Sequence, residues 1–210
     1  WIQRMEAYWQ TSEGQADSAK EMAFFNEQRE RDERVKAAAA VAAQQQAIRA
    51  IGIPDRVLEI VRADVRETEA MQAIDAITTT LVLSGNPGCG KTVAACSWLF
   101  GFGSGLFVKS AKLARWDRYD DDEMRRLLET PRLVLDDLGT EYQDAKGNFD
   151  SILDEVVDVR YDRKLATVIT TNLDATTFKA RYGERIADRI RESGKFVSLD
   201  AIRSGDTMAD

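Results

Sequence analysis

Histidine is absent from this chain of 210 residues, and cysteine occurs only twice. A zinc site made of Cys and His needs several such ligands, so the sequence excludes that kind of site. If Cys89 and Cys96 lie along one helix, about 10 Å separates them, which is too far for a disulfide. We therefore expect two free thiols and a reducing cytoplasm as the location of the protein.

Long apolar runs and an excess of basic residues are missing as well. No stretch is long and apolar enough to span a membrane, and no secretory signal is present, so we expect no membrane association. The 29 basic residues are outnumbered by 36 acidic ones, which gives a formal net charge of −7. This balance argues against tight nucleic-acid binding through overall charge, although a local basic channel is compatible with it.

Glycine and proline are scarce in residues 1–50, which contain one glycine and no proline. Their dense mixture of Glu, Gln, Arg, Lys and Ala predicts an all-α segment, with the alanine-rich residues 37–43 as a helical linker. Aromatic and methionine side chains recur at helical spacing upstream of this linker: Trp1, Met5, Tyr8, Trp9, Met22, Phe24 and Phe25. Such a stripe either packs between the segment's own helices or docks a partner protein.

The sequence Ile-Gly-Ile-Pro at 51–54 ends the helical segment, so we divide the chain into residues 1–50 and 51–210. Apolar residues at helical spacing then predict helical structure in 55–77. Beyond it, short apolar runs alternate with helical patterns, and the expected strands are 78–83, 106–108, 133–135, 166–171 and 196–199. This alternation predicts an α/β domain with a parallel five-stranded sheet covered by helices.

The most informative stretch is LVLSGNPGCGKT at residues 81–92, where Gly85 is followed after four residues by Gly90-Lys91-Thr92. This is the complete pattern of a phosphate-binding loop. Its glycines let backbone N–H groups turn toward phosphate oxygens, Lys91 reaches the β- and γ-phosphates, and the Thr92 hydroxyl ligates Mg²⁺. We expect ATP and Mg²⁺ as cofactors, with the nucleotide bound by Gly85, Asn86, Pro87, Gly88, Cys89, Gly90, Lys91, Thr92 and Val93.

Polar residues also follow two other apolar strands. Asp136 is placed to hold Mg²⁺ together with Thr92, and Asp137 to orient or deprotonate the water that attacks the γ-phosphate. Asp137 has a short side chain for this task, because Asp reaches less far than Glu. Asn172 either positions the attacking water or caps the helix that follows it.

Taken together, these residues resemble the AAA+ ATPases of the ASCE group of P-loop proteins. The narrower resemblance is to bacterial and phage helicase loaders of the DnaC/DnaI type and to the related IstB transposition ATPase. The resembling stretches are GIP at 52–54, SGNPGCGKT at 84–92, LVLDDLGTE at 133–141, VITTNL at 168–173 and RYGERIADRI at 181–190. They cover roughly residue 51 to the end but not the N-terminal helical part, which is the partner-choosing region in that family.

The resemblance implies a role for each matching residue. Lys91 and Thr92 would form Walker A, Asp136 and Asp137 Walker B, and Asn172 would be sensor 1. Arg189, with Arg185 as the second choice, would be an arginine finger that reaches the γ-phosphate on a neighbouring subunit. The alternative is that Arg185, Arg189 and Arg191 form a solvated helix face that pairs with Glu184 and Asp188.

Three further expectations come from the same family. Arg203 matches its sensor 2 arginine, and the small helical lid of many AAA+ proteins is expected to be missing after it. Single-stranded DNA would be contacted by Lys109, Ser110 and Lys112, with Trp116 as an aromatic platform. The other interpretation of these lysines is an ordinary surface helix.

The function implied by the resemblance is an ATP-dependent helicase loader. It would bind a hexameric replicative DNA helicase through residues 1–50 and place it on single-stranded DNA. ATP would lie between subunits of a homo-oligomer, which we expect to be hexameric or spiral. The alternatives are an IstB-like transposition ATPase that binds duplex DNA and a nucleotide-switched adaptor with little hydrolysis.

Overall fold

The computed structural model describes residues 1–63, 68–75, 77, 79–115, 121–141 and 148–199. The chain divides into two units, Trp1–Gln46 and Ala47–Asp210. The division falls inside a helix, a few residues before the expected boundary at 50/51, because Ile48 and Ile51 are buried in the core of the second unit. None of the helices in the described part of the chain is both long and apolar enough to cross a membrane.

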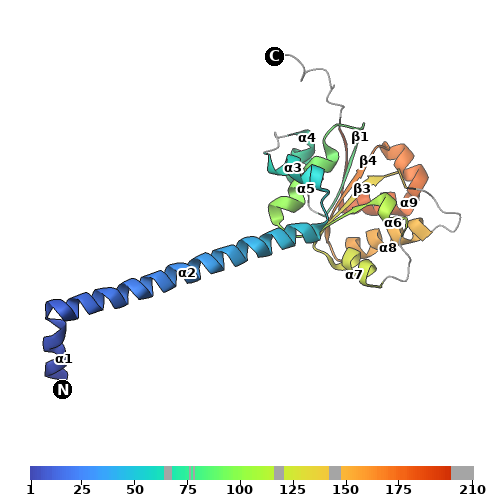
Figure 1. Ribbon diagram of the computed structural model, residues 1–210. Coiled ribbons are helices and arrows are strands. Elements are labelled where there is room, and N and C mark those ends of the chain that lie inside the picture. Colours follow the sequence, from blue (N-terminus) through green and yellow to red (C-terminus); the bar gives the residue numbers. More distant parts are fainter. Residues whose placement is uncertain (64–67, 76, 78, 116–120, 142–147, 200–210) are drawn as a thin grey trace, which may run out of the picture. The chain divides into compact units, whose positions relative to one another are not determined.

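The N-terminal unit consists of helix α1 (Ile2–Trp9) and most of helix α2 (Ser12–Ile51), drawn in blue in Figure 1. The corner between them requires Gly14, since a Cβ atom at that residue would lie only 2.1 Å from the carbonyl oxygen of Tyr8. The Tyr8 hydroxyl donates a 2.6 Å hydrogen bond to Asp17. The predicted all-α N-terminal segment is therefore confirmed, with a corner defined by its only glycine.

The aromatic stripe of this unit does not pack between its own helices. Trp1 is 93% exposed, Phe24 is 58% exposed and Phe25 is 64% exposed. Tyr8 and Trp9 contact each other edge to face, as do Phe24 and Phe25, but each pair consists of sequence neighbours. The interpretation that the stripe packs between the segment's own helices is wrong for the described residues, because neither helix covers these rings.

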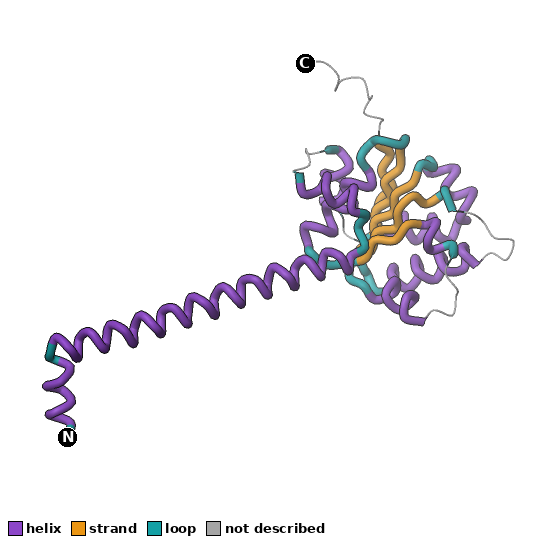
Figure 2. Tube along the Cα trace, in the orientation of Figure 1, coloured by secondary structure: helices purple, strands orange, loops and turns teal. Residues whose placement is uncertain are grey.

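A five-stranded parallel sheet forms the centre of the second unit, with the strand order β2-β3-β4-β1-β5 (Figure 2). Each strand confirms a predicted one, within a few residues at the ends. They are β1 (Thr80–Gly85), β2 (Leu106–Lys109), β3 (Arg132–Leu138), β4 (Ala166–Thr171) and β5 (Gly194–Leu199). Because all strands run the same way, the carboxyl ends of β1, β3 and β4 meet at one edge of the sheet.

Alternating strand residues send apolar side chains to two separate cores. Leu81 and Leu83 of β1 belong to one cluster, and Val82 between them belongs to the other. The first core is covered by α3 (Asp55–Arg62), α4 (Glu69–Asp75) and α5 (Lys91–Phe102). The second is covered by α6 (Ser110–Leu113), α7 (Asp121–Glu129), α8 (Asn148–Asp162) and α9 (Ala175–Ser193). The predicted α/β fold is confirmed, and the region 55–77 contains two helices, α3 and α4.

One fully buried polar residue joins several of these elements. The Arg160 guanidinium donates hydrogen bonds to the carbonyl oxygens of Leu127, Thr130 and Ala166 and to the Thr167 hydroxyl, at 2.7–2.8 Å. Burial lowers the pKa of Arg160 to about 10. The residue therefore stays charged at neutral pH and ties α8 to the end of α7 and to the beginning of β4.

Candidate nucleotide-binding site

The glycine-rich loop connects the carboxyl end of β1 to the first turn of α5. Gly88 and Gly90 have φ angles of 90° and 86°, a left-handed region that side chains with a Cβ rarely adopt. A Cβ atom at either position would meet no other atom within 4 Å, so the space beside the loop is open. Gly85 is needed for a different reason, because a Cβ there would lie 2.7 Å from the carbonyl oxygen of Leu199.

Lys91 is buried, and its ammonium group folds back onto the loop that precedes it. It donates to the carbonyl oxygens of Gly85 at 2.7 Å and Asn86 at 3.0 Å. It also donates to Oδ1 of Asn172, the residue that follows β4, at 3.1 Å. The structure thus places Lys91 and the predicted sensor residue in direct contact.

Asp136 is the buried carboxylate of the site, and one of its oxygens has two partners. The hydroxyls of Thr92 and Thr170 donate to Oδ1 at 2.7 Å and 2.8 Å. The other oxygen, Oδ2, is buried and has no hydrogen-bond partner among the described residues. Burial raises the pKa of Asp136, although these two hydroxyls oppose the effect.

This arrangement fits Mg²⁺. A buried carboxylate oxygen without a partner is costly unless a proton or a cation joins it. Thr92 Oγ1 lies directly beside the same carboxylate. Among the described residues no cluster of three or more His, Cys, Asp or Glu is suited to hold a metal. Asp136 and Thr92 suit Mg²⁺ by their own chemistry, because this ion is usually bound by one or two carboxylates together with water and phosphate oxygens.

Asp137 adopts a left-handed backbone conformation, with a φ angle of 59°, at an irregularity in the pairing of β3 with β4. Three hydroxyls hold this conformation. The backbone N–H of Asp137 donates to Thr170 Oγ1 at 2.9 Å, and its carbonyl accepts from Ser110 at 2.7 Å and from Thr140 at 2.8 Å. Thr170 thus bonds both acidic residues, a supporting role that no sequence motif indicated.

These elements surround a cavity of about 280 Å³ beside the loop. Asp137 and Asn172 line it from the ends of β3 and β4, together with six of the predicted loop residues: Pro87, Gly88, Gly90, Lys91, Thr92 and Val93. Asn172 does not cap the next helix, since Asp174 is the N-cap of α9 and accepts from the Thr177 N–H at 2.8 Å. The capping interpretation of Asn172 is therefore wrong. Arg203, the predicted sensor 2 residue, lies outside the described residues.

Glu141 connects residues 139–141, which follow β3, to helix α9 through hydrogen bonds. One of its carboxylate oxygens accepts from the Gly139 N–H at 2.7 Å. The other accepts from the Arg181 guanidinium and from the Tyr182 hydroxyl, both at 2.7 Å. Burial alone would raise the pKa of Glu141, but these donors outweigh it and hold the pKa below its ordinary value. The network places the segment beside Asp137 in a fixed position against α9.

Arg185 and Arg189 lie on the second half of α9 and pair with helix α8. Arg185 contacts Asp154 at 2.9 Å and Asp158 at 3.0 Å, and Arg189 contacts Asp158 at 3.1 Å. Of the pairs expected on a solvated face of α9, the one between Arg191 and Asp188 is present at 2.9 Å. Arg185 and Arg189 instead pair mainly with the carboxylates of α8. Among the described residues, no contact joins either arginine to the glycine-rich loop at residues 85–92 of the same chain.

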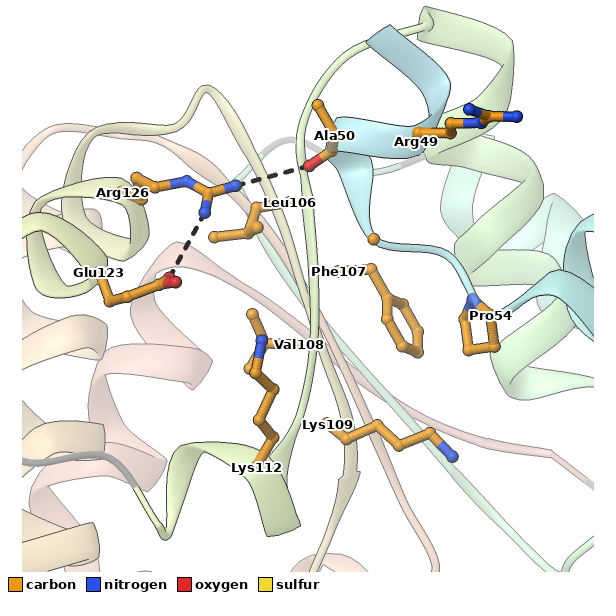
Figure 3. A pocket seen from close by; sticks show the side chains of 11 residues that line it. Arg49, Ala50, Pro54, Leu106, Phe107, Val108, Lys109, Lys112, Glu123 and Arg126 are labelled. Carbon is orange, nitrogen blue, oxygen red and sulfur yellow. Dashed lines mark hydrogen bonds and ion pairs between the residues drawn. The ribbon is translucent and has the colours of Figure 1, made fainter. Parts of the chain in front are cut away.

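Two of the predicted DNA contacts line a second cavity, of about 470 Å³, next to the edge strand β2 (Figure 3). Lys109 extends from the end of β2 and Lys112 from α6, and Arg49 and Arg126 lie on the same cavity. Ser110 is a correction, because it is completely buried and its hydroxyl is used on Asp137. Trp116 lies outside the described residues.

No family model matches the sequence, and no curated protein matches it. Solved structures do match. The DnaC helicase loader is 20% identical, with a TM-score of 0.58 over 70% of this chain and 99% of that chain. DnaI is 22% identical, with a TM-score of 0.55 over 70% of this chain and 94% of that chain. The replication initiator DnaA bound to AMPPCP and single-stranded DNA is 14% identical, with a TM-score of 0.50 over 68% of this chain and 45% of that chain.

The predicted resemblance is confirmed at the level of the fold: the chain shares its fold with the DnaC and DnaI loaders and with the replication initiator DnaA. In this chain the glycine loop follows β1, and the acidic pair Asp136-Asp137 lies near the end of β3.

Proposed function

We propose that this protein is an ATP-dependent loader of a replicative DNA helicase. It binds Mg²⁺ and ATP between subunits of a homo-oligomer in the cytoplasm, holds the helicase through residues 1–50, and places it on single-stranded DNA. The observation that carries the proposal is the arrangement at Asp136, where two threonine hydroxyls occupy one oxygen and leave the other for a cation. The contact of Lys91 with Asn172 at the same edge of the sheet supports it.

In this proposal each residue of the cavity has a defined task. Lys91 exchanges its carbonyl partners for the β- and γ-phosphates, and the N–H groups of the loop bind the same anion. Thr92 and Asp136 hold Mg²⁺, which neutralises charge on the phosphates when bound. Asp137 accepts a proton from the attacking water, and Asn172 orients that water.

The subunit arrangement follows from where the arginines lie. Arg189 and Arg185 contact α8 and not the loop of their own chain. A cation beside the γ-phosphate strongly stabilises the transition state of phosphoryl transfer. We therefore assign Arg189 to the γ-phosphate of a neighbouring copy, which makes ATP hydrolysis a property of the assembled oligomer.

The partner contacts are assigned from exposure and charge. The N-terminal unit leaves large apolar side chains in water, among them Trp1, Ile2, Met22 and Phe25. Exposed apolar groups of this kind mark surfaces that bind another protein. Lys109 and Lys112, beside the edge of the sheet, are assigned to the phosphates of single-stranded DNA.

The test combines helicase binding with nucleotide binding in the full chain. We expect a hexameric replicative helicase to co-elute with the protein. Phe25→Asp should abolish co-elution and leave ATP affinity unchanged, and Lys91→Ala should abolish ATP binding. Arg31→Ala, an exposed polar change on the same helix as Phe25, is the matched control and should behave as the unaltered protein. Failure of the unaltered chain to bind the helicase at any nucleotide condition would refute the loader assignment.

The nucleotide-switched adaptor remains the second candidate, and one observation favours it. The base at the end of β3 is Asp137, whose side chain is shorter than that of Glu and whose backbone is fixed by three hydroxyls. Slow hydrolysis is the expected result of such a base. An adaptor would keep its function with Asp137→Asn, whereas a hydrolysing loader would lose helicase release. The IstB-like alternative has less support, because a net charge of −7 disfavours duplex binding.

A further inference from the structure

Helices α8 and α9 share a cluster of charged and aromatic side chains around the two arginines. Asp158 lies at its centre and uses both carboxylate oxygens. Oδ1 contacts Nε of Arg189 at 3.1 Å, and Oδ2 contacts a terminal nitrogen of Arg185 at 3.0 Å. The Arg189 guanidinium also lies over the ring of Tyr161, 4.5 Å from the ring centre.

The two arginines differ in which nitrogens they use. Both terminal nitrogens of Arg185 form ion pairs with carboxylates, one with Asp154 and one with Asp158. Arg189 is held by its inner Nε, and within the described residues its terminal nitrogens make no hydrogen bond to a carboxylate. The nearest one is Glu192, whose carboxylate lies 3.8 Å from Nη1. The terminal nitrogens of Arg189 are thus engaged only by this long ion pair of Nη1 with Glu192, and they keep the hydrogen-bond donors that bind phosphate in a bidentate manner.

Tyr161 is itself held in place. Its hydroxyl donates a 2.8 Å hydrogen bond to Glu192, one turn after Arg189 on the same helix. A free arginine side chain samples many rotamers, and holding it against a fixed ring and a carboxylate removes that freedom before any ligand binds. An arginine prepared in this way loses less entropy when it meets a phosphate.

We infer that Asp158 and Tyr161 are positioning residues, which hold Arg189 so that its terminal nitrogens meet the γ-phosphate bound to a second copy of this chain. Arg185 orients Asp158 and does not itself contact the nucleotide. This inference rests on the proposed function, since it concerns the surface that one subunit offers to the ATP of the next.

Mixing two inactive variants of the full chain tests the inference. Arg189→Ala keeps an intact loop but offers no arginine, and Asp137→Asn offers the arginine but cannot activate water. We expect a mixture of the two to regain ATP hydrolysis. If the second partner is Asp137→Asn/Asp158→Ala or Asp137→Asn/Tyr161→Leu, the regained kcat should fall by about tenfold or more, with KM unchanged. Asp137→Asn/Asp158→Asn, which keeps an acceptor for Nε, should restore part of the activity.

The matched control is Asp137→Asn/Glu155→Ala, because Glu155 lies on the same helix and makes no ion pair in the part of the chain that the structure describes. It should restore hydrolysis fully, and all partners should unfold at similar temperatures. No regained activity in the first mixture would refute the transfer of Arg189 between subunits, and with it this part of the proposed function. Full activity with the Asp158→Ala partner would leave the trans arginine intact and overturn the positioning role.

Discussion

Among single residues, Asp136 is the basis for assigning Mg²⁺ to this site, because its second carboxylate oxygen is buried without a partner in the described structure. We predict that Asp136→Asn weakens the binding of ATP in the presence of Mg²⁺ by about tenfold or more, since the ion loses the carboxylate assigned to it. ATP binding without Mg²⁺ should change much less, because Lys91 and the loop remain. Calorimetric titration with and without Mg²⁺ measures both values. An equal loss under the two conditions would contradict the assignment of the metal to Asp136.

The residues of the site divide into those that a sequence pattern reveals and those that it hides. Lys91, Thr92, Asp136 and Asn172 lie at strand ends or in a loop of fixed spacing, so their meeting point could be predicted. Thr170 could not, because a threonine in an apolar strand is also what β-propensity favours. Its role depends on the irregular pairing of β3 with β4, which turns the Asp137 N–H toward the threonine hydroxyl.

At the scale of elements, Arg160 joins α7, α8 and β4 through hydrogen bonds to three carbonyl oxygens and one hydroxyl. Arg160→Lys should lower the free energy of unfolding by about 2–4 kcal/mol, because an ammonium cannot reproduce the planar fork and leaves buried carbonyls without a donor. Urea denaturation measures the loss. Arg163→Lys, an exposed change at the end of the same region, is the control and should leave the midpoint in place. Equal midpoints for the two variants would exclude this role of Arg160.

Breaks within helical regions are structural features that a sequence pattern does not predict. The region 55–77 contains two helices, α3 and α4, although its apolar residues keep one helical spacing. Helix α9 also departs from its pattern, because Gly183 has a φ angle of 87° in the middle of the helix. The stretch before this kink is held by Glu141 and the stretch after it by the carboxylates of α8. Periodicity cannot reveal such a break, since both halves bury the same face.

At the scale of the whole molecule, the arginine and the loop that it serves are expected to belong to different copies. We predict that the rate of ATP hydrolysis per subunit rises with protein concentration, while the amount of ATP bound per subunit stays constant. Steady-state hydrolysis and equilibrium binding over a dilution series measure the two quantities. Arg189→Ala should show a low rate at every concentration. A rate per subunit that is independent of dilution would mean that each copy hydrolyses ATP alone.

The two units differ in how far their sequences determine their roles. The α/β unit follows from the alternation of strands and helices together with one loop motif. For the N-terminal unit, composition predicts helices, but it does not tell whether Phe24 and Phe25 are covered by the chain itself. The structure leaves them exposed. Sequence periodicity is the same for a helix face that packs against its own chain and for one that stays exposed. The three-dimensional structure is therefore needed to distinguish the two cases.

The folded-back side chain of Lys91 has a consequence for how quickly ligand is captured. Its ammonium group bridges the carbonyl oxygens of Gly85 and Asn86, and this internal cross-link fixes the shape of the loop. Under the proposed function, a triphosphate would therefore meet a loop that is already formed. Its binding would require Lys91 to exchange the two carbonyl oxygens for phosphate oxygens, which is a change in one side chain.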